Sequence, residues 1–401
     1  MYFYRFFSTL AERVGLGAVF EKFLFVLGSG NFPVRANLWV GLAQSMPGVA
    51  SLCMDILAGC LVDARPERRA RLVWASSLLA LIGVLLHAAA LLTEQQVVVL
   101  IMLFLWGVFQ ELATVSSEAI FADSIAEGQR LEPTVKKDMA KFFGAACSGL
   151  ILFILGLART AGWQTSDMKL TMAVGLVLMV PAMISLCNFR DPERNGNEQR
   201  AERFQDWRVP YLLAVSDWIK SFGAGMSAKF YGLWLIQDQR FSLMMIGILQ
   251  MITPWVTVAV LFFTKKIANC FGRAQLSLAL FGLAAAGLWL LAGTTWLPAV
   301  WVVYPLREAM TASCFALDRS ILSDFTPTER RGCWNAATSI VTTMPWSGTA
   351  FLGGYLSDRW GYAYNMRVTA GIYVFACLVY SPLVMWVPRR QVEEAPVADE
   401  P

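Results

Sequence analysis

The residues that could do chemistry are ionised side chains inside long apolar stretches. Glu111 and Glu118 stand seven residues apart, so in a helix they share one face. Arg307 and Arg319 lie in a similar stretch of the second half, and Lys229 follows a glycine pair. A charge at membrane depth is expensive unless it is paired or hydrated, so such residues mark pathways for solutes or ions. We predict that they line a central cavity, with Glu118 and Arg319 as the first candidates.

Three uncharged side chains extend this candidate solute site. Gln44, Gln250 and Trp346 offer polar or stacking groups at depths related by the internal repeat described below. Asp55 ranks lower because it stands close to the end of its apolar segment. His87, the single histidine, lies in an apolar segment and is typical of a packed residue rather than a proton relay.

Glu111 and Glu118 are also our candidates for coupling to an ion. A carboxyl group in a partly dehydrated cavity can load and release a proton near neutral pH. An alternative stays open, in which the charges only pair with one another, Arg307 with Glu111 and Arg319 with Glu118, and so hold the two halves together. No metal site or cofactor is predicted, because the eight cysteines stand singly and form no CxxC pair.

The composition shows where these charges must reside. Of 401 residues, 57% are hydrophobic and 15% are charged, and the mean hydropathy is +0.52. A soluble domain carries about 25% charged residues. The net charge of +4 is dispersed over short loops, which argues against a nucleic-acid partner. The chain is therefore predicted to be an all-α, multi-pass membrane protein with the lipid bilayer as its surroundings. No cleavable leader is recognised, so the first segment is expected to be retained.

Twelve segments are long and apolar enough to be predicted as spans, since a bilayer takes about 20 apolar residues. They cover residues 3–27, 38–62, 72–92, 97–123, 135–158, 170–189, 209–236, 243–264, 274–292, 296–324, 334–356 and 366–386. Charges interrupt the first, which would otherwise lie on the surface as an amphipathic helix; the repeat favours spanning. In the seventh, where Asp217 and Lys220 stand one turn apart, a helix break is expected at Gly223–Gly225, with freed backbone groups lining a cavity.

A polar run near the middle divides the chain. We predict a six-helix bundle over 1–189, a cytosolic linker over 190–208, a second six-helix bundle over 209–388 and a disordered tail over 389–401. Lys and Arg gather in the loops on one side, which places both termini in the cytosol.

Internal repetition relates the two halves. Gly41, Gln44 and Pro47 recur as Gly247, Gln250 and Pro254, and AIFADSIAEGQR (119–130) matches SILSDFTPTERR (320–331). The second match superimposes Asp123 on Asp324 and Arg130 on Arg331. A near-constant offset of half the chain is typical of a parallel repeat in a transporter fold, and it predicts two pseudo-symmetric bundles.

The loop GCLVDARPERRAR (59–71) resembles the signature of the major facilitator superfamily (MFS). Gly59, Leu61, Asp63, Arg68 and Arg71 fit it, whereas a proline at 66 stands where the family usually has glycine. The partner loop KIANCFGR (266–273) keeps Gly272 and Arg273 but has asparagine at 269 instead of aspartate. Strings of the second half, such as LDRSILSDFTPTERRGCWNA, are similar to an MFS group found in plants, algae and protists.

The signature needs small residues for close helix approach, an acid near a helix end, and arginines that pair with neighbouring acids. We predict a cytosolic latch that holds one state of the alternating-access cycle, with ordinary topology-setting loop charges as the alternative. Its members are Gly59, Asp63, Arg68, Arg71, Asp123, Arg130, Gly272, Arg273, Asp324 and Arg331.

The resemblance implies a secondary or facilitative transporter that moves a small organic solute by alternating access, with the MFS fold. Lys229, Arg307 and Arg319 favour an organic anion or zwitterion, and proton coupling is a possibility. The chain is expected to be a monomer. The alternative is a non-transporting member of the fold that serves as a receptor or partner subunit. A membrane enzyme is disfavoured because one histidine and no GxSxG motif leave most such mechanisms without their groups.

Overall fold

The computed structural model describes residues 1–31, 35–64, 69–125, 131–158, 163–190, 207–325 and 331–387. For residues 31, 56, 63–64, 122–123, 131–132, 134, 323–324 and 331–339 it describes the backbone alone. Every regular element in these ranges is a helix. The helices are α1 (Tyr2–Gly15), α2 (Ala18–Asn31), α3 (Ala36–Ala64), α4 (Arg69–Thr93), α5 (Gln96–Asp123), α6 (Leu131–Ala158), α7 (Thr165–Cys187), α8 (Arg208–Ala228), α9 (Tyr231–Gln237), α10 (Leu243–Phe271), α11 (Arg273–Gly293), α12 (Leu297–Phe325), α13 (Arg331–Gly348), α14 (Ala350–Trp360), α15 (Tyr362–Tyr380) and α16 (Leu383–Trp386).

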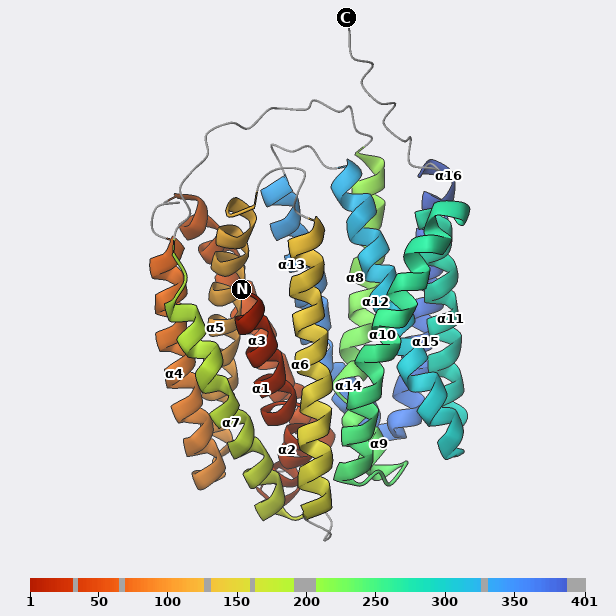
Figure 1. Ribbon diagram of the computed structural model, residues 1–401. Helices are drawn as coiled ribbons and strands as arrows, with labels where there is room; N and C mark the ends of the chain where they lie inside the picture. The colour runs from red at the N-terminus through yellow and green to blue at the C-terminus, as the bar shows by residue number, and fades with distance from the viewer. Residues whose placement is uncertain are drawn as a thin grey trace, which may run out of the picture.

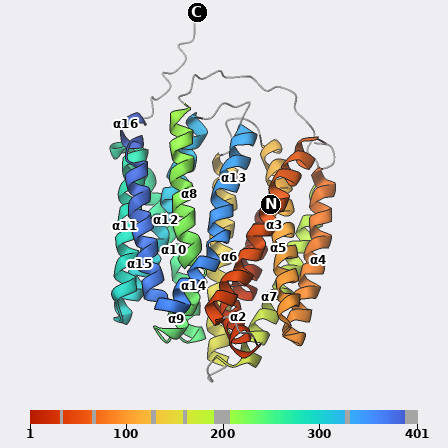
Figure 2. The ribbon, with the colours of Figure 1, turned by 180° about the vertical axis from the view of Figure 1, so that it is seen from behind.

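The long helices run along a common direction (Figure 1). Helices α1 to α7 lie on one side, and α8 to α12 with α15 and α16 lie on the other. Seen from behind, α13 and α14 lie between these groups and follow α3 (Figure 2), which they contact. Helix α6 packs against α10 and forms a second junction between the groups.

Eight helices within the described ranges are long and apolar enough to cross a membrane. These spans are Ala36–Val62, Arg69–Thr93, Gln96–Phe121, Val135–Ala158, Thr165–Cys187, Leu243–Phe271, Arg273–Gly293 and Tyr362–Trp386. Their outward faces carry large exposed apolar side chains, such as Leu78 and Leu85 of α4 and Val177 of α7. An apolar surface of this kind is stable against lipid rather than water.

The other segments predicted to span are short, broken or charged. The first is divided into α1 and α2 at Leu16 and Gly17. The seventh is also divided, but the predicted position of its break is wrong: α8 continues through 223–225 and ends at Ala228. The glycines serve packing instead, because a side chain at Gly225 would collide with the Trp346 carbonyl oxygen and the Thr349 hydroxyl group.

Glycines bring the two groups of helices into backbone contact. Helix α6 crosses α10 where Gly149 lies against Gly247, and a side chain on either would meet the backbone of the other helix. A side chain at Gly41 of α3 would likewise collide with the Ala350 carbonyl oxygen of α14. Close approach through small residues is how helices associate in lipid, where the hydrophobic effect gives no driving force. Gly41 and Gly247, which the repeat aligns, therefore both lie at junctions between the groups.

Candidate functional site

One end of the molecule joins the two groups of helices through hydrogen bonds. The Asp358 carboxylate accepts the backbone N–H groups of Asn37 (3.1 Å) and Leu38 (2.9 Å), and so caps the start of α3 from α14. The Tyr362 hydroxyl group donates to Asn37 Oδ1 at 2.6 Å. Because these bonds join α3 of the first group to α14 and to α15 of the second group, we call this the closed end.

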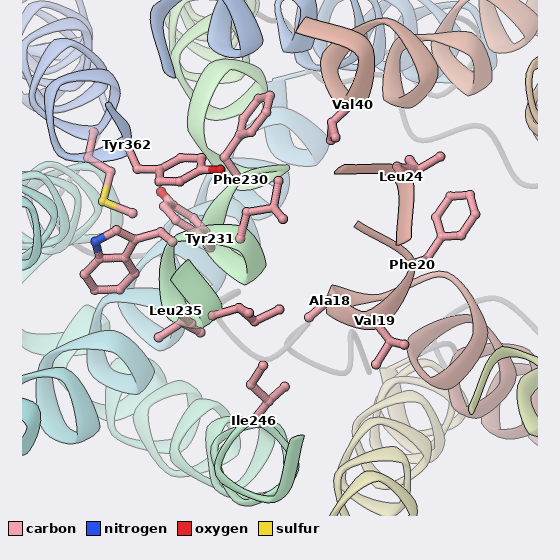
Figure 3. Close-up of a cluster of buried hydrophobic side chains, with 14 of the residues drawn as sticks. Ala18, Val19, Phe20, Leu24, Val40, Phe230, Tyr231, Leu235, Ile246 and Tyr362 are labelled. Carbon is pink, nitrogen blue, oxygen red and sulfur yellow. The ribbon is translucent and has the colours of Figure 1, made fainter. Parts of the chain in front are cut away.

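A second contact and an apolar layer complete the closed end. The Trp163 indole N–H donates to the Phe241 carbonyl oxygen at 3.1 Å, from the start of α7 to the start of α10. Figure 3 shows buried side chains of α2 on one side and side chains around α9 and α10 on the other. Phe20 and Leu24 belong to the first set, and Leu235 and Ile246 to the second. The layer packs apolar side chains of the two groups against each other at this end.

Three candidate site residues lie close together beside this layer. Lys229 lies in the connection between α8 and α9, and its Nζ is 3.6 Å from the centroid of the Trp346 ring. Glu21 of α2, in the other group of helices, is close enough to Lys229 for a favourable electrostatic interaction. Lys229 and Trp346 were both predicted site residues, and the structure brings them together. Glu21 was missed because its charge had been interpreted only as an interruption of the first span.

Glu111 of α5 joins a pair of acids. It accepts a hydrogen bond from the Ser51 hydroxyl group of α3 at 2.9 Å. The carboxyl group of Asp55, one turn further along α3, lies close enough to interact with it directly. Asp55 is buried, with 6% of its surface exposed. The sequence interpretation ranked Asp55 lower; the bundle brings it to Glu111, which spacing along separate helices cannot show.

Arg307 does not pair with Glu111. It is buried in the second group, where its guanidinium group pairs with Glu308 and donates to the Tyr373 hydroxyl group at 3.3 Å. The same group lies 5.0 Å from the centroid of the Tyr231 ring. Neighbours on α9, α12 and α15 thus provide most of the interactions of the Arg307 guanidinium group. The alternative in which Arg307 pairs with Glu111 is therefore not realised.

Glu118 and Arg319 do not face each other as a pair. Glu118 forms ion pairs with Arg5 of α1 and with Lys137 of α6, the latter at 2.6 Å, all within the first group. Arg319 is exposed, and the charges it influences are those of Lys141 and Asp217. The alternative in which Arg319 pairs with Glu118 is therefore not realised, because α1 and α6 bring two cations to Glu118. A direct contact of either residue with a solute stays a prediction.

Of the remaining predicted site residues, some are buried and others are partly exposed. Gln44 is buried in α3, and Gln250 of α10 is half-buried, with an Oε1 atom that forms no hydrogen bond within the described chain. Trp346 is 37% exposed.

Most of the predicted latch lies outside the described residues. This applies to Arg68 and Arg130, and to the side chains of Asp63, Asp123, Asp324 and Arg331. Gly59 has open space around it, and Arg71 is exposed. Gly272 adopts a φ of 95° where α10 ends and α11 begins, a conformation that favours glycine. Arg273 donates to the Ser320 hydroxyl group at 2.7 Å and so joins α11 to α12.

The second group also contains a buried ion cluster. Lys220 of α8 pairs with Asp318 of α12 at 2.7 Å and with Asp217 at 3.1 Å. Ser277 and Tyr380 each donate to Asp318 Oδ1 at 2.8 Å. We call these five residues the Lys220 cluster. It links α8, α11, α12 and α15, and its acids and base satisfy one another inside the protein.

Comparisons with known proteins add the following. The sequence model of the Major Facilitator Superfamily matches residues 36–344. The fold is similar to a bacterial homologue of the human lysosomal transporter Spinster in an inward-facing, occupied conformation (TM-score 0.72, 13% identity, 98% of this chain and 97% of that chain). It is also similar to a D-xylose–proton symporter (0.68, 15%, 97% and 97%) and to the human organic anion transporter MFSD10 (0.64, 13%, 94% and 97%). No curated protein sequence matches significantly. At these identities the solved structures show a shared fold alone.

Proposed function

Because this chain belongs to the major facilitator superfamily, we propose that it is a secondary transporter that moves a small organic solute by alternating access. The observation that carries the proposal is the acid pair of Asp55 and Glu111, held between α3 and α5 in a bundle that is closed at one end. A carboxyl pair at this depth is costly unless it serves an ion or solute pathway.

We further propose that twelve segments cross the membrane. Eight are the apolar helices above; the other four would be α1 with α2, α8 with α9, α12, and α13 with α14. The charges that lower the hydropathy of α8 and α12 support this count, because they point into protein. Lys220 and Asp318 are each 2% exposed, and Arg307 is 5% exposed. Buried pairing is the usual condition of an ionised residue within a span.

The closed end is proposed to face away from the cytosol. Helix α3 begins at the closed end with Ala36, so Arg69 and Arg71, at the start of α4, lie at the opposite end. Basic residues near span ends mark the cytosolic side, and both termini would lie there too. The structure would then represent an inward-facing state, the conformation in which the similar Spinster homologue was crystallised.

The acid pair is proposed as the proton-coupling centre. Two carboxyl groups held side by side repel when both are ionised, and they are best accommodated with one shared proton. Within the described chain, neither Asp55 nor Glu111 forms a salt bridge. Glu118 differs because two cations hold it ionised. Of the two predicted coupling residues, Glu111 is therefore the better supported.

The test is uptake into liposomes that contain the purified protein. A pool of radiolabelled small organic acids would be offered with and without an inward proton gradient. We expect the gradient to drive accumulation of at least one solute. Glu111→Gln and Asp55→Asn should abolish accumulation above equilibrium and preserve exchange of the same solute, because binding remains while the proton is lost.

Glu94→Gln is the control, since it removes a partly exposed carboxylate that lies outside both the acid pair and the predicted solute site. It should retain gradient-driven accumulation. Gradient-driven accumulation that survives both acid-pair substitutions would exclude the pair as the coupling centre. Absence of any saturable uptake or exchange would favour the receptor or partner-subunit alternative.

A further inference from the structure

A positively charged side chain at the boundary between the two groups of helices has unfilled hydrogen-bonding capacity. Helix α8 ends at Ala228 and α9 begins at Tyr231, which places Lys229 at the junction. Its ammonium group lies 3.6 Å from the Trp346 ring centroid, well within the range of a cation–π contact. Within the described chain, Lys229 donates no hydrogen bond to any acceptor. Ammonium groups normally use their N–H donors when water is excluded.

Three other cations of the interior differ from Lys229 because they bond an acid directly. Lys220 bonds two carboxylates, Arg307 bonds Glu308 and Tyr373, and Lys137 bonds Glu118. Lys229 has a charge partner without a direct bond. Because Lys229 lies at the junction of α8 and α9 and against the Trp346 ring, it is well placed to receive an acceptor from outside.

The charge partner comes from the opposite group of helices. Glu21 of α2 lies against the backbone of Gly232, so closely that any side chain at 232 would collide with Glu21 Oε2. That oxygen is buried and forms no hydrogen bond of standard geometry within the described chain, although the nearby Gly232 N–H also stabilises the Glu21 carboxylate. Glu21 and Lys229 are close enough for their charges to attract each other. The Glu21 carboxylate thus already lies near Lys229, although the two groups form no direct hydrogen bond.

We infer that Lys229 and Trp346 form a subsite for the carboxylate group of an organic solute, and that Glu21 takes the place of this group while the closed end is shut. The inference rests on the proposed transport function and specifies its solute as a carboxylate. When α2 and α9 separate, Lys229 loses its nearby acid, and an unpaired charge in this place is unfavourable. A solute carboxylate that bonds Lys229 directly restores the balance. Solute binding and opening of the closed end are thereby coupled.

The test measures binding rather than transport. Purified protein in detergent would be titrated with benzoate, nicotinate and succinate, and in parallel with the neutral amide of each, by isothermal calorimetry. At least one carboxylate should bind wild type, whereas its amide should not. Lys229→Gln should weaken that carboxylate about tenfold or more, and Glu21→Gln should tighten it about tenfold, because the internal competitor is removed.

Lys266→Gln is the matched control for Lys229→Gln. Lys266 also lies over an aromatic ring, 4.6 Å from the centroid of Phe262, but it is exposed on α10. It should leave carboxylate affinity unchanged. Size-exclusion profiles and thermal melting would establish that each variant is folded.

A gain of affinity in Glu21→Gln is the decisive sign, since a merely structural role of Glu21 predicts a loss. The inference is overturned if none of the carboxylates binds wild type, if Glu21→Gln binds no tighter, or if Lys229→Gln binds equally well. Binding with the expected pattern but without liposome uptake would refute the transport proposal and leave the subsite standing. Unchanged uptake in Lys229→Gln would refute the subsite and leave transport standing.

Discussion

Each half attaches its first helix to a later helix through an ion pair, with the cation on the first helix, but the surroundings of the two pairs differ. In the first half, Arg5 of α1 pairs with Glu118 of α5. In the second half, Lys220 of α8 pairs with Asp318 of α12. Each pair joins the first predicted span of its half to the fourth.

The surroundings of the two pairs differ in sign and in exposure. Glu118 lies between two cations, and the side chains are 13–32% exposed. Lys220 lies between two acids, and those side chains are 2–9% exposed. Exposed ion pairs contribute little to stability, whereas loss of one partner from a buried pair leaves an uncompensated charge. The second half therefore has the fixed attachment, and the first half has one that solvent and salt can loosen.

Removal of the central cation of the Lys220 cluster should show the difference between the two halves most clearly. Lys220→Met leaves Asp217 and Asp318 buried without a counter-charge. We expect a loss of about 3–5 kcal/mol in the free energy of unfolding, the usual result of breaking a buried pair. Titration with SDS in mixed micelles, followed by tryptophan fluorescence, would measure it. Lys266→Met, a change of an exposed lysine, should have little effect, and an equally small effect of Lys220→Met would contradict the comparison.

Removal of a hydrogen bond from the same cluster should have an intermediate effect. Tyr380→Phe keeps the ring packed against Lys220, 4.6 Å from its centroid, and deletes only the hydroxyl group that bonds Asp318. A hydrogen bond to a charged group contributes about 1.5–3 kcal/mol, so a loss in this range is expected by the same SDS titration. Tyr211→Phe, at an exposed position of α8, is the control. A neutral result for Tyr380→Phe would mean that Asp318 is satisfied without it.

The ion pairs of the first half should be the weakest and the most sensitive to salt. Glu118→Gln should lower the free energy of unfolding by about 1 kcal/mol or less, because the group is partly hydrated. Raising the ionic strength should shrink the difference between this variant and wild type, since salt screens partly exposed charges. A loss as large as that of Lys220→Met, or one unaffected by salt, would show that the two halves are attached alike.

Much of the helical architecture could be predicted from the sequence, because apolar runs of bilayer length allow few alternatives. The boundaries were less predictable. The eighth predicted span ended at residue 264, whereas α10 continues to Phe271 through Lys265 and Lys266. A helix can continue beyond the apolar part of the bilayer, because the backbone hydrogen bonds of its last turns also form in water. Hydropathy locates the apolar part of such a helix and not its end.

The candidate site was predictable as a set of residues but not as a set of contacts. Glu111 and Glu118 share a face of one helix, yet α3 brings an acid to the first and α1 brings a cation to the second. Spacing along a helix fixes the direction of a side chain, but the neighbour it meets belongs to another helix. Lys229 and Trp346 lie far apart in the chain and were predicted separately. Only the packing of the helices shows that they contact each other.

The sequence alone determined that the chain is helical, belongs in a membrane and carries a limited number of charges that must be sheltered there. It could do so because the penalty for exposing polar groups to lipid acts on every residue separately. Only the tertiary structure decided which charges neutralise one another, which remain as a carboxyl pair, and that Lys229 lies against Trp346 without a hydrogen bond inside the described chain. Those outcomes depend on distances of a few ångströms between side chains from different helices, and such distances are properties of the packed bundle.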